Sequence, residues 1–323
     1  MVLNRIWSLL PLTKAVDNLK KFILSSLVFS GLTKINGERE IVADLAKSWD
    51  ISSDKKTYTF TLKDNLKWQD GKPLSANDIA FTIGLVQNPD TRSPLAANWN
   101  GVKYEVVNDN TIRFILPSSY GNFLSNTTTG ILPKHKLDKV KPSNIRSNEF
   151  NQKPIGSGPY KLDLLEVDSS SITLKASENY YVHQPYIEEI RIVLFQNTKD
   201  MISALIRKQV DAVSGVLPED VATVEKIQGI NNYQIGLPAY VGAFFNLKSP
   251  VLSNPKVRQA FAYSTDRKAI ISDSLGGQGA IAYYPIPAGF VGFNGTAQKY
   301  QYDEARAQEL IQQRSEEHTS ELQ

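Results

Sequence analysis

The sequence predicts an α/β protein that is built from more than one domain. Its 323 residues exceed what a single hydrophobic core usually supports, so two or more lobes are expected. Residues 56–82 carry the pattern of a strand, a tight turn and a capped helix in direct succession. Residues 190–213 carry the pattern of strand, helix and strand, which is typical of a parallel β-α-β unit.

The segment 56–82 contains three separate local signals. Its strand alternates polar residues with apolar ones, namely Tyr58, Phe60 and Leu62, as a strand with one buried face does. Asp70-Gly71 then supplies the chemistry of a tight turn. Ser75 stands three residues ahead of Asp78, which predicts a helix N-cap with an acidic residue in the first turn, where the helix dipole favours it.

Further elements are expected along the rest of the chain. Before the final third they are a hairpin over 102–116 that turns at 108–110, a strand over 190–194, a helix capped by Asn197 that ends at Lys208, a strand over 210–213 and a helix start at Pro218. A strand over 234–246 comes next, followed by helices over 254–263 and 266–275, the second ended by Gly276-Gly277. Asp303 is expected to cap a last helix that ends at Gln313.

The last ten residues, 314–323, form a polar stretch without an apolar face. They resemble a translated sequencing adapter, so we interpret them as a non-native tail that interrupts the gene. Near the other end, the apolar stretch 22–29 is far shorter than the ~20 residues that span a bilayer. We expect it to form a buried helix and expect no signal segment in this chain.

Composition and motifs argue against most catalytic classes. The chain has no cysteine, which excludes thiol catalysis, thiolate metal sites and disulfides. His135 and His183 stand in predicted loops without a partner at metal-ligand spacing, so neither a metal nor another cofactor is expected. The net charge of +3 is mild, and the basic run 134–141 is expected to be a solvated face, not a nucleic-acid site. Residues 156–158 (Gly-Ser-Gly) precede a strand, so they predict a turn with positive φ and no phosphate loop.

Five separated motifs, in order, resemble one known family. They are residues 45–49 (LAKSW), the segment 56–82, residues 154–161 (PIGSGPYK), residues 178–181 (ENYY), and residues 257–261 (VRQAF) with Asp266-Arg267. On these motifs the chain is identified as similar to the bacterial family 5 extracellular solute-binding proteins, the oligopeptide and dipeptide receptors of ABC importers. The resemblance extends from about Ser30 to Gln313.

The resemblance implies a bilobal fold of the type II periplasmic-binding-protein class, with a smaller subdomain inserted in the first lobe. Carried onto this chain, residues 1–27 and 136–238 would form the base of lobe one. The inserted subdomain would be 28–135, and 239–313 would begin a second lobe that is incomplete. We expect such a fragment to expose apolar surface.

The resemblance also implies a function. The expected role is the substrate-binding component of an ABC importer, which captures peptides in a cleft between lobes and delivers them to permease subunits. The expected location is extracytoplasmic, in the periplasm or as a cell-surface lipoprotein, and the protein is expected to be monomeric and not an enzyme. The family motifs are structural, so a receptor for a nickel chelate, a sugar or haem remains open. A carboxylate hydrolase using Asp211 and Glu219 is a more distant alternative.

Seven residues are the candidates for lining the cleft: Asn98, Trp99, Val213, Ser214, Gly215, Tyr240 and Phe244. Residues 213–215 would offer backbone groups at the end of the predicted strand 210–213. Tyr240 and Phe244 would supply apolar walls, and Asn98 with Trp99 would close the cleft from the inserted subdomain. For each of the three aromatic residues, ordinary core packing is the alternative.

Overall fold

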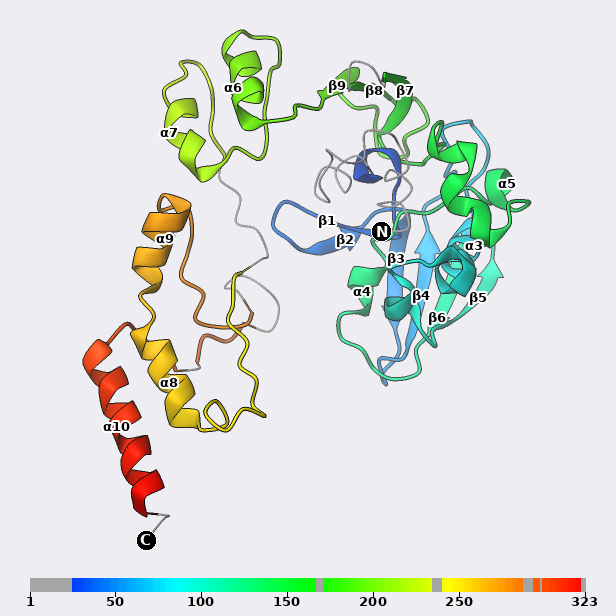
Figure 1. Ribbon diagram of the computed structural model, residues 1–323. Coiled ribbons are helices and arrows are strands. Elements are labelled where there is room, and N and C mark those ends of the chain that lie inside the picture. Colours follow the sequence, from blue (N-terminus) through cyan, green and yellow to red (C-terminus); the bar gives the residue numbers. More distant parts are fainter. Residues whose placement is uncertain (1–24, 167–170, 234–239, 287–292, 297, 321–323) are drawn as a thin grey trace. The chain divides into compact units, whose positions relative to one another are not determined.

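The computed structural model describes residues 25–166, 171–233, 240–286, 293–296 and 298–320. The chain divides into two compact units, Met1–Gln196 and Asn197–Gln323, and each is described here by itself. Helices and strands are both present, as predicted (Figure 1). Among the described residues, no helix combines the length and the apolar character that crossing a bilayer requires.

The described residues of unit 1 form three antiparallel sheets (Figure 1). The smallest pairs β1 (Thr33–Ile35) with β2 (Ile41–Ala43). The four-stranded sheet has the order β3-β4-β6-β5, and its strands are β3 (Ala46–Ile51), β4 (Thr57–Leu62), β5 (Lys103–Asn108) and β6 (Thr111–Ile115). The third sheet has the order β7-β8-β9, with β7 (Tyr160–Glu166), β8 (Ser171–Ala176) and β9 (Glu189–Val193). The predicted strand that carries Tyr58, Phe60 and Leu62 and the hairpin over 102–116 are therefore confirmed.

Helix α3 (Ala76–Gln87) begins where the sequence predicts. The backbone N–H of Asn77 donates to Ser75 Oγ at 3.3 Å, and the N–H of Ser75 donates to Asp78 Oδ2 at 3.0 Å, which completes a capping box. The second oxygen of the buried Asp78 carboxylate accepts from the N–H of Lys134 at 2.9 Å. One acidic side chain thus caps α3 and fixes the start of α5 (Lys134–Leu137).

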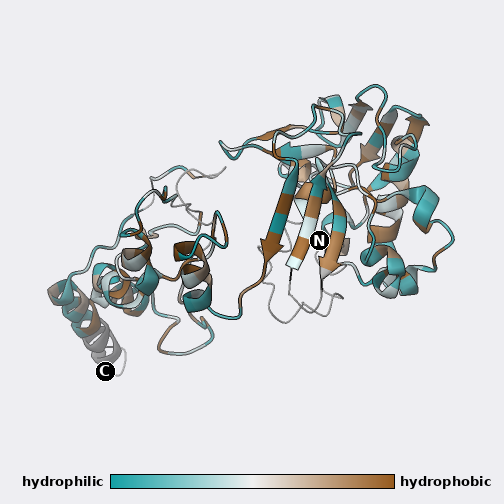
Figure 2. Cartoon of the chain, turned by 90° about the horizontal axis from the view of Figure 1, so that it is seen from above, coloured by the Kyte–Doolittle hydropathy of each residue, from teal (hydrophilic) through white to brown (hydrophobic). Residues whose placement is uncertain are grey.

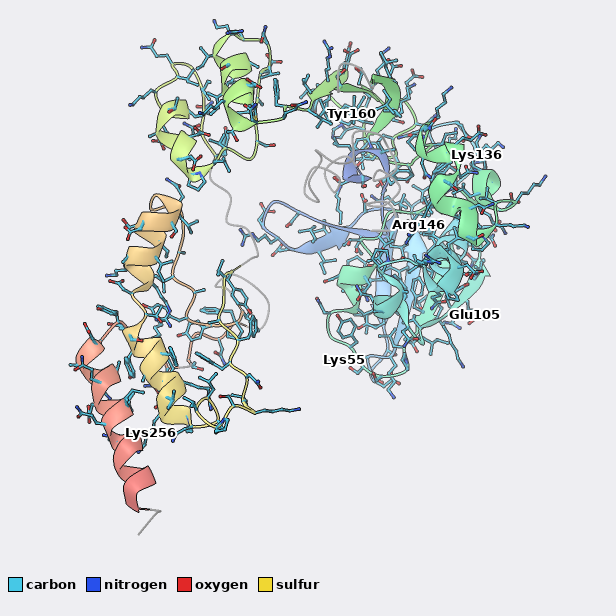
Figure 3. All side chains as sticks on the ribbon, in the orientation of Figure 1. Lys55, Glu105, Lys136, Arg146, Tyr160 and Lys256 are labelled. Atoms are coloured by element: carbon cyan, nitrogen blue, oxygen red, sulfur yellow. The ribbon has the colours of Figure 1, made fainter. Side chains whose placement is uncertain are left out.

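Short helices complete unit 1. They are η3 (Pro89–Thr91), η4 (Ala96–Trp99), α4 (Phe123–Asn126), η5 (Pro142–Ser147) and η6 (Glu149–Asn151). Arg146, labelled in Figure 3, donates from Nε to the carbonyl oxygen of Thr91 at 3.1 Å, which ties η5 to η3. Such side-chain bonds satisfy the carbonyl groups that short helices leave unpaired.

Two hydrophobic clusters form the core of unit 1. The first lies under the four-stranded sheet, and its largest fully buried side chains are Trp68, Trp99, Phe60, Phe114 and Phe123. The second joins Leu132 and Leu137 to the sheet β7-β8-β9. Figure 2 shows long hydrophobic stretches on the strands of this unit and many hydrophilic loops around them. The predicted domain boundary at His135 falls between Leu132 and Leu137 in sequence, and it stays a prediction.

The turn Gly156-Ser157-Gly158 is held by one glutamine. Gln69 Nε2 donates to the carbonyl oxygens of Gly158 at 3.2 Å and Tyr160 at 2.7 Å, and Gln69 Oε1 accepts from the N–H of Gly156 at 2.8 Å. A Cβ on Gly156 would lie 1.8 Å from the carbonyl oxygen of Val28. Neither glycine of this turn has positive φ, so the sequence-based reason was wrong. Close approach of two backbones is what requires glycine here.

Unit 2 is mainly helical. Its elements are α6 (Thr198–Ile206), η7 (Pro218–Asp220), α7 (Val221–Val224), α8 (Pro255–Ser264), α9 (Arg267–Leu275) and α10 (Glu304–Ser320). The predicted caps are present: Asn197 Oδ1 accepts from the N–H of Asp200 at 2.9 Å, and Asp303 Oδ1 accepts from that of Arg306 at 2.9 Å. A small cluster of Ala260, Ala307 and Leu310 joins α8 to α10.

Three predicted elements differ from the structure. Residues 210–213 form no strand, and β9 pairs antiparallel with β8, so the predicted β-α-β unit was wrong. A strand needs a neighbouring strand for its backbone hydrogen bonds, and no described strand pairs with residues 210–213, which are exposed or half-buried. Of the predicted strand over 234–246, residues 234–239 lie outside the described part, and 240–246 form no strand. Helix α10 continues through Ser320 instead of ending at Gln313, because Glu and Arg residues beyond Gln313 have high helix propensity even where no apolar residues recur.

Candidate ligand-binding residues

The candidates of unit 1 are next to each other but differ in exposure. Asn98 is exposed, whereas Trp99 is 1% exposed within the first hydrophobic cluster. The Trp99 ring packs against Phe114 and Phe123, with centroids 5.3 Å and 5.5 Å away. Its indole Nε1 has no hydrogen-bond partner among the described residues. Core packing, the alternative for this residue, is therefore what the structure shows, and a ligand contact by Trp99 stays a prediction.

The loop that carries Asn98 and Trp99 is anchored through its backbone. Gln87 Nε2 donates to the carbonyl oxygens of Trp99 at 2.8 Å and Val102 at 2.7 Å. Asn126 Nδ2 donates to the carbonyl oxygen of Asn98 at 3.1 Å. An open cavity of about 500 Å³ borders this loop and is lined by residues that include Gln87, Trp99 and Lys103.

The other five candidates lie in unit 2. Val213 is half-buried, and Ser214 and Gly215 are exposed; Gly215 has φ of 75°, which favours glycine. Tyr240 and Phe244 are 45% and 90% exposed. Their rings flank Gly242, since a Cβ there would lie 3.1 Å from Tyr240 Cε2 and 3.9 Å from Phe244 Cε2. The structure brings these two aromatic residues together, and their role as ligand walls stays a prediction.

A buried polar cluster in unit 1 was not predicted from the sequence. The carboxylate of Asp44, 5% exposed, accepts a hydrogen bond from Tyr181 Oη at 2.6 Å and lies 3.4 Å from Lys34 Nζ. Tyr181 Oη also lies 2.9 Å from Ser30 Oγ. The ammonium group of Lys63 lies 4.8 Å from the centroid of the Tyr181 ring. We call Ser30, Lys34, Asp44, Lys63 and Tyr181 the Asp44 cluster.

Burial and charge shift two ionisable groups in the Asp44 cluster. Burial raises the pKa of Tyr181 far above its ordinary value, and the charge of Asp44 and their hydrogen bond raise it further. Tyr181 therefore stays neutral and keeps the single proton that it donates to Asp44. Burial lowers the pKa of Lys63, and the nearby positive charge of Lys34 lowers it further, while Asp44 opposes both effects.

The sequence contained one signal for this cluster. Tyr181 belongs to the motif at 178–181, but the motif does not show which residue its hydroxyl contacts. Asp44 and Ser30 are 137 and 151 residues away from Tyr181 in the chain. No spacing rule can pair residues so distant, which is why local reasoning missed the cluster.

The other polar candidates from the sequence are two carboxylates and His135. Asp211 and Glu219, the candidates for a hydrolase, are both exposed. His135 is the second residue of α5, so its predicted place in a loop was wrong, and its Nε2 lies 2.8 Å from Asp70 Oδ2, a contact that the sequence did not predict. Within the described ranges, no group of three or more His, Cys, Asp or Glu side chains is arranged to hold a metal ion.

Comparison with known sequences agrees with the predicted family. The profile of bacterial extracellular solute-binding proteins, family 5 Middle, matches residues 40–321. The oligopeptide-binding protein AppA of Bacillus subtilis is 29% identical over 296 residues, which are 89% of this chain and 54% of AppA. The dipeptide-binding protein of Escherichia coli is 28% identical over 303 residues, 86% of this chain and 55% of that protein. The chain therefore spans little more than half the length of these curated relatives.

Solved structures give the same result for the fold. The ABC transporter substrate-binding protein CtaP of Listeria monocytogenes matches with a TM-score of 0.83 and 30% identity, over 93% of this chain and 61% of CtaP. NikZ of Campylobacter jejuni, in complex with Ni(L-His), matches with a TM-score of 0.75 and 30% identity, over 90% of this chain and 58% of NikZ. AppA of Bacillus subtilis, in complex with a nonapeptide, matches with a TM-score of 0.75 and 27% identity, over 91% of this chain and 59% of AppA.

These matches confirm the fold predicted from the sequence motifs. The three solved structures match 90% or more of this chain, whereas the domain boundaries and the seven candidate ligand contacts stay predictions. Because the family profile covers most of the chain, the protein belongs to the bacterial extracellular solute-binding proteins of family 5.

Proposed function

We propose that this protein is the substrate-binding component of an ABC importer and that its ligand is a peptide. The observation that carries the proposal is the family match together with relatives described as oligopeptide- and dipeptide-binding proteins. A structure of one such relative contains a bound nonapeptide. The ligand is bound and released without chemical change, and the receiving partners are the permease subunits of the importer.

The physical requirements of such a receptor fit the candidate residues. A receptor for peptides of varied sequence holds the peptide backbone and leaves hydrated space for the side chains. Residues 240–246 carry exposed aromatic rings and form no strand, so their backbone groups are available to an extended peptide. We propose Tyr240 and Phe244 as apolar walls, residues 213–215 as backbone contacts, and Asn98 with Trp99 as contacts from unit 1. Closure of the two lobes around a peptide would exclude water and strengthen each hydrogen bond.

The proposed location is outside the cytoplasm, in the periplasm or on the cell surface as a lipoprotein. Family members are extracellular solute-binding proteins, and this supports the location. We propose that the protein acts as a monomer and does not bind nucleic acid, since its net charge is only +3.

The test is to purify the protein gently from cells and to measure its mass under native conditions. The expected result is a retained mass of peptide size, released on collisional activation and identified by sequencing. A peptide library should then bind in solution. Retention of no peptide, together with no binding from the library, would refute the peptide assignment.

A second candidate ligand is a nickel chelate. The observation that favours it is the match to NikZ, whose structure holds Ni(L-His), at 30% identity. Calorimetric titration with Ni²⁺ and histidine together, compared with each alone, separates the two candidates. Heat only from the combination would favour the chelate, and heat only from peptides would favour the main proposal.

A further inference from the structure

The Asp44 cluster contains more positive than negative charge. Lys34 Nζ lies 3.4 Å from the Asp44 carboxylate, which is therefore already paired with one ammonium group. The same carboxylate accepts the hydroxyl proton of Tyr181 at 2.6 Å. Two lysines thus share one carboxylate, and the cluster has an excess of one positive charge.

Lys63 is the cation without a carboxylate of its own. Among the described residues, no Asp or Glu oxygen lies within 4.0 Å of its ammonium group, whose recorded contact is the Tyr181 ring at 4.8 Å. The Lys63 side chain is half-buried, and burial disfavours its charged form. A half-buried ammonium group without an anion is costly, because charges removed from water are normally paired.

The surroundings of Lys63 suit an incoming anion. Lys34 is exposed, with 47% of its side chain accessible, and Lys63 is half-buried, so neither residue is closed off from solvent. Tyr181 and Lys34 both contact the Asp44 carboxylate, and Ser30 Oγ lies 2.9 Å from the same Tyr181 hydroxyl. Asp44 is thus already engaged by two other groups, while its charge opposes the lowering of the Lys63 pKa by burial and by Lys34.

We propose that Lys63 and Lys34 together bind a carboxylate group of the ligand. The inference rests on the proposed function, since the carboxylate is taken to be that of a bound peptide, either its C-terminus or an acidic side chain. A carboxylate between the two ammonium groups would gain charge-assisted hydrogen bonds and balance the excess charge. Lys63 acts as the primary contact, and Lys34 shares its charge between the ligand and Asp44.

The experiment compares two charge-removing variants of the purified protein. Lys63→Met removes the proposed contact, and Lys47→Met is the matched control, because Lys47 is exposed and pairs with Asp64 at 3.7 Å. Lys63→Arg keeps the charge and serves as the rescue variant. Each protein is titrated by calorimetry with a peptide in three forms: the free acid, the C-terminal amide, and the amide carrying one internal Glu in place of Gln.

The expected result is that Lys63→Met weakens binding of carboxylate-bearing peptides by roughly tenfold, since one charge-assisted hydrogen bond is lost. The amide without Glu should bind the variant and the unaltered protein equally well. If Lys63→Met loses affinity for the free acid alone, the group bound by Lys63 is the peptide C-terminus. If it loses affinity for the Glu-containing amide alone, the group is an acidic side chain. Lys47→Met should match the unaltered protein, and Lys63→Arg should restore most of the affinity.

The outcomes separate this inference from the proposed function. If peptides bind and Lys63→Met behaves like Lys47→Met for every form, the carboxylate site is refuted and peptide binding stands. If no peptide binds, the proposed function fails, and an acetate titration followed by NMR of the labelled lysine side chains decides the site. Movement of the Lys63 signals with acetate, and not with chloride, supports the site; unchanged signals refute it. Circular dichroism of Lys63→Met checks that the variant is folded.

Discussion

Single residues in this protein are constrained most strongly where two backbones meet. A Cβ on Gly156 would lie 1.8 Å from the carbonyl oxygen of Val28, which backbone atoms cannot avoid by rotation. We expect Gly156→Ala to lower the free energy of unfolding by about 3 kcal/mol, because the added methyl group forces a shift of the buried backbone. Urea unfolding measures the effect. Gly37→Ala is the control, since nothing lies within 4 Å of its added Cβ, and equal losses in both variants would contradict the argument.

The charge of Asp70 makes the stability of the folded protein depend on pH in the acid range. Burial alone would raise its pKa, but hydrogen bonds from His135 and from the N–H of Lys72, with the nearby charges of His135 and Lys136, outweigh burial and lower the pKa. A lowered pKa in the folded state adds stability above the unfolded pKa of about 3.9, and this stability is lost as pH falls through the folded pKa.

We therefore expect Asp70→Asn to destabilise the protein near neutral pH and to have progressively less effect below about pH 4. The measurement is the urea midpoint of both proteins across this range. Asp64→Asn is a suitable control, because 71% of the Asp64 side chain is exposed. A difference between Asp70→Asn and the unaltered protein that stays constant down to acid pH would show that Asp70 acts without its charge.

The candidate site shows where reasoning from single residues stops. Trp99 was considered for the cleft or the core, and only Phe114 and Phe123, from other elements, decide that its ring is buried. Phe244 has the same two interpretations, cleft wall or core packing, and it is 90% exposed in the described structure. Burial depends on contacts between distant parts of the chain, so residue type and local pattern could not settle either question.

Elements with strong local signals were predicted correctly. The capping box of α3 requires only Ser75, Asp78 and the helix that follows, and all of these lie within one turn. The strand over 210–213 was predicted from four residues whose pairing partner had to come from elsewhere, and it is absent. Helices and hairpins close their own hydrogen bonds, whereas parallel strands depend on remote neighbours.

The two residues of the α3 capping box should contribute unequally to the free energy of unfolding. Ser75→Ala removes one cap and should cost about 1 kcal/mol of unfolding free energy. Asp78→Ala should cost more, about 2 kcal/mol, because it leaves the partly buried N–H groups of both Ser75 and Lys134 without their acceptor. Chemical denaturation of the two variants gives the order. A larger loss for Ser75→Ala would show that the contact from α3 to α5 contributes little.

At the scale of the whole molecule, the two units differ in how much core they contain. All members of the two large hydrophobic clusters belong to unit 1, from Leu27 to Leu194. The buried cluster recorded within unit 2 consists of Ala260, Ala307 and Leu310, with Tyr263 packed against it. Cooperative folding requires enough buried apolar surface to offset the loss of chain entropy, and the described residues of unit 1 supply much more of it than those of unit 2.

We therefore expect residues 1–196, expressed alone, to unfold in a single cooperative transition. Residues 197–323, expressed alone, should show helical circular dichroism that declines gradually on heating, because their helices are supported by few buried contacts. Thermal melts followed in the far and near ultraviolet measure both, and amide exchange should protect β4, β6 and β8 most strongly. A gradual melt of residues 1–196 would mean that the hydrophobic clusters of unit 1 need the rest of the protein to be stable. Unit 1 would then not be the independently stable part of the chain.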